Sequence, residues 1–161
     1  MRSKTCVHGF LADAHLVRNA PDLRNCGAAA WEDYSVKLSR PRQLSAIERS
    51  ILDALLDPEF SGVQALRDQL DGVIVVGRCD CGCPTIDLQA SGITLDAASR
   101  ATWGRTPYEG VVWDHEGEVV GDIILFVDGG NLTSLEYVQH EGLPPEEWPH
   151  IESIGVIGPI V

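Results

Sequence analysis

The sequence predicts an α+β fold in which two N-terminal helices pack on an antiparallel sheet of about five strands, arranged as a hairpin followed by a meander. Three observations indicate this class: helical spacing of apolar residues over 45–71, β-branched runs from residue 73 onwards, and glycine and aspartate residues between the later runs. The chain has 161 residues, of which 44% are hydrophobic. That is the length of one domain, which buries roughly two thirds of its unfolded surface.

The first expected helix begins after Ser45, because Glu48 follows it three residues later. This spacing is typical of a capping box, in which the serine hydroxyl and the glutamate carboxylate each accept a hydrogen bond from a backbone amide. Pro58 should end the helix, since its ring cannot continue the backbone hydrogen bonding. One face of this helix then carries the apolar residues Ile47, Ile51, Leu52, Leu55 and Leu56.

The second expected helix is shorter and starts with the same signature. Ser61 is followed three residues later by Gln64, which predicts another capping box. The helix should end near Asp71 and Gly72. Its apolar face would consist of Val63, Leu66 and Leu70.

The remaining patterns predict strands. Residues 73–76 are a β-branched run, and residues 85–88 match it across a cysteine-rich connection, so a hairpin is expected. Turn-rich segments then separate three further strands, which should form an antiparallel meander over residues 108–113, 118–127 and 132–138.

Near its C-terminus the chain alternates between proline-rich and apolar segments. Residues 143–149 favour extended backbone, with Trp148 either filling a groove of the domain or displayed as part of a recognition peptide. The apolar residues beyond must pack somewhere. We expect them to add an edge strand to the sheet or to form the contact of a homodimer; they are Ile151, Ile154, Val156, Ile157, Ile160 and Val161.

The hydrophobic periodicity changes near residue 42, and this change predicts the domain organisation. Residues 1–41 show no sustained period of 3.6 or 2, so we expect a poorly ordered or spurious extension there, with a structural arm as the alternative. Residues 42–161 should form the single α+β domain. No apolar run approaches the ~18 residues of a membrane helix, and no export signal is visible, so we expect a cytoplasmic protein without membrane contact.

The charge of the chain constrains its partners. The net charge is −12, but residues 1–42 carry seven basic and four acidic side chains, and the remainder carries five arginines and twenty acids. Phosphate binding needs a basic surface, so nucleic acid is excluded as a partner of residues 43–161. Either a basic protein binds the acidic surface or that surface only maintains solubility.

Cys79, Cys81 and Cys83 carry the most specific chemical signal, because three thiols lie within five residues. In extended backbone such residues project to the same face, where three thiolates can bind one ion. Zinc would take a fourth ligand from His115 or His140, whereas cuprous ion tolerates fewer and softer ligands. Two alternatives stay open. The thiols could perform redox chemistry, or the cluster could only shape a turn with Gly82 and Pro84.

Three segments stand out together: the helix opening Arg42-Gln43-Leu44-Ser45 with Glu48-Arg49, the string Arg78-Cys79-Asp80-Cys81-Gly82-Cys83-Pro84-Thr85-Ile86-Asp87-Leu88, and Gly130-Asn131-Leu132-Thr133-Ser134-Leu135-Glu136. In these segments the chain resembles a family of small, uncharacterised bacterial proteins classed as a domain of unknown function. The Cys-x-Cys-Gly-Cys-Pro motif is the most specific of them. The resemblance spans roughly residues 42–150 and implies a compact domain but no activity.

Two functions of different classes are therefore expected. The first is a small, acidic, non-enzymatic interaction domain that binds a basic protein, as an immunity protein binds a toxin. The second is a metal-binding or thiol-redox module built on the three cysteines. The common phosphate-loop, dinucleotide, zincin and serine-hydrolase motifs are absent from the sequence, which disfavours an enzyme.

Overall fold

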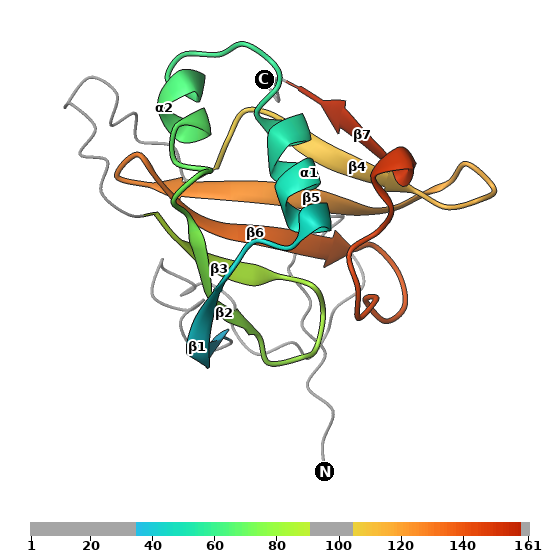
Figure 1. Ribbon diagram of the computed structural model, residues 1–161. Coiled ribbons are helices and arrows are strands. Elements are labelled where there is room, and N and C mark those ends of the chain that lie inside the picture. Colours follow the sequence, from blue (N-terminus) through green and yellow to red (C-terminus); the bar gives the residue numbers. More distant parts are fainter. Residues whose placement is uncertain (1–34, 91–104, 159–161) are drawn as a thin grey trace, which may run out of the picture.

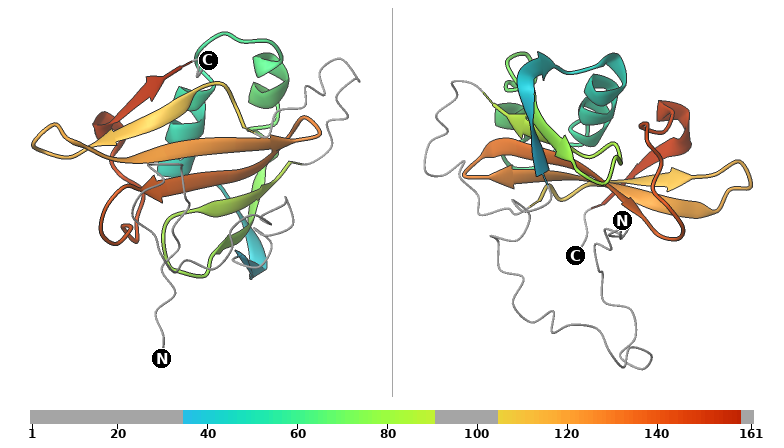
Figure 2. Two further views of the ribbon diagram at one scale, coloured as in Figure 1. Left: turned by 180° about the vertical axis from the view of Figure 1, so that it is seen from behind. Right: turned by 90° about the horizontal axis from the view of Figure 1, so that it is seen from below.

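The computed structural model describes residues 35–90 and 105–158 (Figure 1). Within them a single antiparallel sheet has the strand order β1-β2-β3-β6-β5-β4-β7. Two short helices, α1 and α2, lie on one side of this sheet (Figures 1 and 2). In chain order the elements are β1 (Ser35–Gln43), α1 (Ala46–Leu55), α2 (Val63–Arg67), β2 (Ile74–Cys79), β3 (Ile86–Gln89), β4 (Glu109–Trp113), β5 (Val119–Asp128), β6 (Asn131–Gln139), a 3-10 turn (Ile151–Ser153) and β7 (Ile154–Ile157).

The expected fold class is wrong. The described residues form mostly antiparallel sheet with seven strands instead of about five, and a strand, β1, precedes the two helices. The prediction missed β1 because most of its residues are exposed, so no buried face imposes an alternating pattern. Pro41 lies where the register of β1 against β2 shifts, between Lys37 and Arg42, as expected for a proline confined to an edge strand.

Helix α1 forms as its sequence predicts. The hydroxyl of Ser45 accepts a hydrogen bond from the Glu48 amide at 3.4 Å, and the Ser45 amide donates to the Glu48 carboxylate at 2.7 Å. Both halves of the capping box are therefore present. The apolar face of the helix, including Ile51, Leu52 and Leu55, is buried against the sheet.

The second predicted helix is present as α2, but it is shorter than expected and its cap differs. It covers only five residues, and its N-cap is Gly62, at φ 88°, without a side-chain hydrogen bond, so the capping box expected at Ser61 is wrong. A glycine suits this position because other residues rarely adopt a positive φ. The segment beyond Arg67 is held by the buried side chain of Gln69, whose amide donates to the carbonyl of Gly130 at 2.8 Å.

The predicted hairpin and meander are confirmed as local pairings. Strand β2 pairs with β3, β4 with β5, and β5 with β6, all antiparallel. Strand β6 also pairs with β3, through Ile86 opposite Leu135, and this contact joins the hairpin to the meander. Strand β7 adds to β4 at the far edge, so residues 154–157 of the apolar tail supply the expected edge strand, whereas Ile160 and Val161 lie outside the described residues.

The core lies between the helices and the sheet face that they cover. It combines the apolar face of α1 with α2 residues and with inward residues of β2, β3, β5 and β6. Trp148, in the connection from β6 to β7, packs against this core and is half-buried. This packing is consistent with the reading in which Trp148 contacts the domain, while a recognition role of residues 143–149 stays a prediction.

Residues 1–34 lie outside the described residues, so the expected extension over residues 1–41 stays a prediction. Strand β1 begins at Ser35, ahead of the boundary expected at residue 42. No helix in the described ranges is long and apolar enough to cross a membrane.

Candidate metal centre

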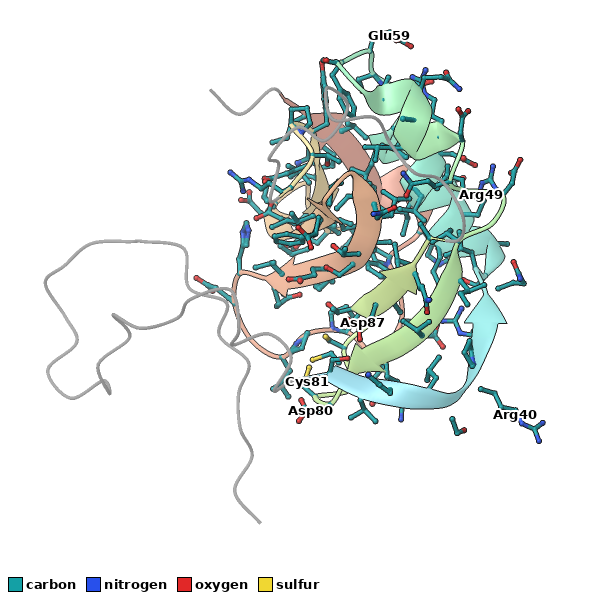
Figure 3. The ribbon with its side chains drawn as sticks, turned by 90° about the vertical axis from the view of Figure 1, so that its left-hand side faces the viewer. Arg40, Arg49, Glu59, Asp80, Cys81 and Asp87 are labelled. Carbon is teal, nitrogen blue, oxygen red and sulfur yellow. The ribbon has the colours of Figure 1, made fainter. Side chains whose placement is uncertain are left out.

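The three cysteines lie on the loop that joins β2 to β3, at the tip of the hairpin. Figure 3 shows Asp80 and Cys81 at this tip. The Cys79 amide donates to the Thr85 carbonyl at 3.1 Å, which closes the base of the loop. The Thr85 hydroxyl in turn accepts a hydrogen bond from the Tyr137 amide at 3.0 Å, which anchors the loop to β6. Gly82 turns the chain with φ 89°.

This loop gathers the three sulfur atoms. The Sγ atoms of Cys79 and Cys81 lie 3.0 Å apart, and all three Sγ atoms lie within 4.8 Å of one another. None of the three cysteines is in a disulfide. Thiolates bound tetrahedrally at the usual zinc–sulfur distance of about 2.3 Å are separated by about 3.8 Å, so small shifts within the 4.8 Å limit would bring the sulfurs to that separation. The sulfur set therefore fits one thiophilic metal ion.

Burial controls the protonation of two of these thiols. It raises the pKa of Cys79 well above the usual value, and the contact with the Cys81 sulfur raises that pKa further. Burial also raises the pKa of Cys83, although a hydrogen bond with Thr85 opposes the shift. Both shifts favour the protonated thiol, which disfavours a reactive thiolate.

The structure does not bring the two predicted histidines into the sulfur set. Of the His, Cys, Asp and Glu residues within 35–90 and 105–158, only the three cysteines form such a group. His115 lies in the turn between β4 and β5 with its side chain 89% exposed. His140 follows β6, and its Nε2 lies 2.7 Å from the Asp122 carboxylate.

A groove adjoins the cysteine loop. We call it the Trp148 groove; its volume is about 470 Å³. It is lined by the cysteine loop and the start of β3, by the connection from β6 to β7, and by the end of β1 and the start of α1. Its lining includes Arg42, Ile47, Glu48, Arg78, Cys83, Pro84, Ile86, Glu146, Glu147, Trp148 and His150.

An ion pair between Arg42 and the buried Glu48 lines this groove. Both terminal nitrogens of Arg42 donate to the two carboxylate oxygens of Glu48, each at 2.7 Å. The Glu48 side chain is 3% exposed and that of Arg42 is 45% exposed. Burial alone raises the pKa of Glu48, but the hydrogen bonds from Arg42 and from Ser45 outweigh it and hold this pKa below its ordinary value.

Sequence reasoning missed the Trp148 groove. Arg42, Arg78 and Trp148 come from three segments that lie far apart in the chain, and no local pattern relates them. The one local signal for this groove is Glu48. The sequence assigns Glu48 only to the capping box at Ser45, although Arg42 lies three positions before Ser45 and can pair with Glu48.

A scan against protein-family models finds no match to this sequence, and searches of the curated proteins and of the solved structures find none either. The resemblance to a small bacterial family with a Cys-x-Cys-Gly-Cys-Pro motif therefore stays a prediction.

Proposed function

We propose that the protein binds one thiophilic metal ion, Zn²⁺ or Cu⁺, through the thiolates of Cys79, Cys81 and Cys83. The observation that carries this proposal is the approach of the three sulfur atoms to within 4.8 Å of one another. Soft thiolate ligands select these two metals among the common biological ions. The loop that holds the sulfurs is anchored at both ends to the sheet, so little ordering is needed when an ion binds.

The two ions differ in the number of ligands that they need beyond the three cysteines. Three soft ligands satisfy Cu⁺, which tolerates a low coordination number. A Zn²⁺ ion held by three residues keeps its fourth position for water or for a ligand from another molecule. Cys81 is exposed and the other two cysteines are half-buried. This exposure supports an exchangeable ion over a closed structural site.

Elemental analysis of untagged protein, purified under reducing conditions without chelator, tests the proposal. We expect about one equivalent of zinc or copper per chain, with three thiols protected until the metal is removed. A protein that carries no metal and takes up neither Zn²⁺ nor Cu⁺ in a titration would overturn the proposal. The cluster would then be a turn or a thiol-redox centre.

Two variants make this experiment specific. Replacement of Cys79, Cys81 and Cys83 together by serine should abolish metal uptake, since serine hydroxyls are poor ligands for soft ions. The matched control replaces the two other cysteines, as Cys6→Ser and Cys26→Ser, and should keep the full equivalent of metal. Loss of metal in the control would contradict a site built on the β2–β3 loop alone.

An acidic interaction domain that binds a basic protein is the second proposal. The net charge of −12 supports it. The exposed carboxylates of Glu146 and Glu147, beside the half-buried Trp148, favour one particular surface for such a partner.

A further inference from the structure

We propose that the Trp148 groove binds a lysine or arginine side chain presented by a basic peptide segment of another protein. This inference deepens the second proposal, because it names the surface and the chemical group that is recognised. It does not depend on the metal.

The walls of the groove suit a long side chain with an apolar stem. Trp148 packs against the core and is half-buried, so its indole is held in place. Pro84 and Ile86 extend this apolar wall on the side of the cysteine loop. Lysine and arginine bury their methylene stems on such surfaces and keep the charged group at the rim. The face of a tryptophan ring also attracts a cation.

The unpaired charges at the groove favour a cation. Arg42 and Glu48 add no net charge to the lining, because the guanidinium is paired with the carboxylate at 2.7 Å. Glu146 and Glu147 are exposed and form no hydrogen bond or ion pair with another described residue. Arg78 is the only groove cation without such a partner among the residues that the structure describes. The unpaired charged side chains of the groove are therefore two carboxylates and one guanidinium, which gives a net negative charge.

The field of the protein acts in the same direction. A net charge of −12 attracts basic molecules over distances of the order of the Debye length, about 10 Å at 0.1 M salt. The net charge attracts a basic molecule without selecting a binding position, whereas the groove provides specific contacts for one side chain. Binding should therefore depend on particular carboxylates and not only on total charge.

The test measures the anisotropy of a fluorescein-labelled peptide in which lysine alternates with glycine, against the full-length protein with chelator present. The Glu146→Gln, Glu147→Gln double variant should weaken binding about tenfold. The matched control is Glu116→Gln with Glu118→Gln, two exposed acids of the β4–β5 turn that give the same change of net charge. This control should weaken binding by less than about threefold. Equal weakening by both doubles, or no binding by the unaltered protein, would overturn the proposal.

A third variant decides the sign of the bound charge. Arg78→Gln removes the unpaired cation of the groove, so it should increase the affinity for the basic peptide by about threefold. If the groove took an anionic group, the same substitution would weaken the binding of an otherwise identical glutamate-containing peptide, and the lysine peptide would not bind. Far-ultraviolet circular dichroism of each variant shows that the sheet is retained. Because chelator is present throughout, failure of the metal proposal leaves this test unaffected.

Discussion

Glu48 serves three groups at the start of α1. Its carboxylate accepts hydrogen bonds from both terminal nitrogens of Arg42 and from the Ser45 amide, and its own amide donates to the Ser45 hydroxyl. The carboxylate is buried, and these hydrogen bonds supply the partners that a buried carboxylate needs. One residue thereby joins the end of β1 to the first turn of α1.

Replacement of Glu48 by glutamine should reduce the free energy of unfolding at pH 7 by about 1–2 kcal/mol. The charge of the pair and one acceptor are lost, while the shape is kept. The control on the same helix is Asp53→Asn, which removes an exposed ion pair with Arg49 at 3.0 Å and should cost less than about 0.5 kcal/mol. Urea unfolding measures both values. A larger loss in the control would contradict the role given to Glu48.

The low pKa of Glu48 sets a pH dependence for this difference. A carboxyl group whose pKa is depressed by folding stabilises the protein above its unfolded pKa, and this stabilisation is lost as pH falls through the folded value. The gap in stability between the unaltered protein and the Glu48→Gln variant should therefore narrow below about pH 4. A gap that stays constant from neutral to acidic pH would show that the carboxylate is not the stabilising species.

At the scale of elements, Gln69 fixes α2 to the turn between β5 and β6. Its amide nitrogen donates to the carbonyls of Ala65 and Gly130, at 3.1 and 2.8 Å, and its oxygen accepts from the Leu132 amide at 3.0 Å. The side chain is 1% exposed, so water cannot replace these partners. A helix of five residues has little stability of its own and depends on such contacts.

Gln69→Leu should destabilise the protein by about 2–4 kcal/mol, because it keeps the volume but leaves the Gly130 carbonyl and the Leu132 amide buried without a partner. Gln64→Leu is the matched control. Gln64 is exposed and bonds only Asp68, at 2.7 Å, so its replacement should change stability by less than about 0.5 kcal/mol. Thermal unfolding compares the two. Equal shifts of Tm would contradict the role of Gln69.

Elements with local signals could be predicted from the sequence, and elements that depend on distant contacts could not. The cap at Ser45 and the β-branched run of β2 are encoded within a few residues. The capping box at Ser61 was wrong because Gly62 caps α2 instead. Strand β1 has an exposed edge without alternation, and only its pairing with β2 makes it a strand.

The same distinction applies to the candidate site. The three cysteines are close in sequence, so their proximity in space could be inferred before the structure was known. The Trp148 groove needs the pairing of β3 with β6 and the return of the chain towards the cysteine loop, which bring together residues about 100 positions apart. No short sequence pattern encodes a contact between residues so far apart in the chain.

At the scale of the whole molecule, the core and the sulfur cluster are separate. The buried apolar residues come from the helices and the inward face of the sheet, and no cysteine of the described residues belongs to them. The cysteine loop lies at the tip of one hairpin, where backbone hydrogen bonds already close its base. We therefore expect folding not to require a metal ion, unlike that of small zinc domains with little core of their own.

We accordingly expect the protein to unfold in one cooperative thermal transition after removal of metal with a chelator. Metal should then raise Tm by linkage alone, with a stabilisation of about 2.7 kcal/mol when free metal is 100 times its dissociation constant. The triple serine variant at positions 79, 81 and 83 should share the Tm of the chelated protein, within the small effect of the substitutions, and should not respond to metal. If the chelated protein showed no cooperative transition, the ion would be part of the fold itself, and the hairpin tip would be a structural centre instead of an exchangeable one.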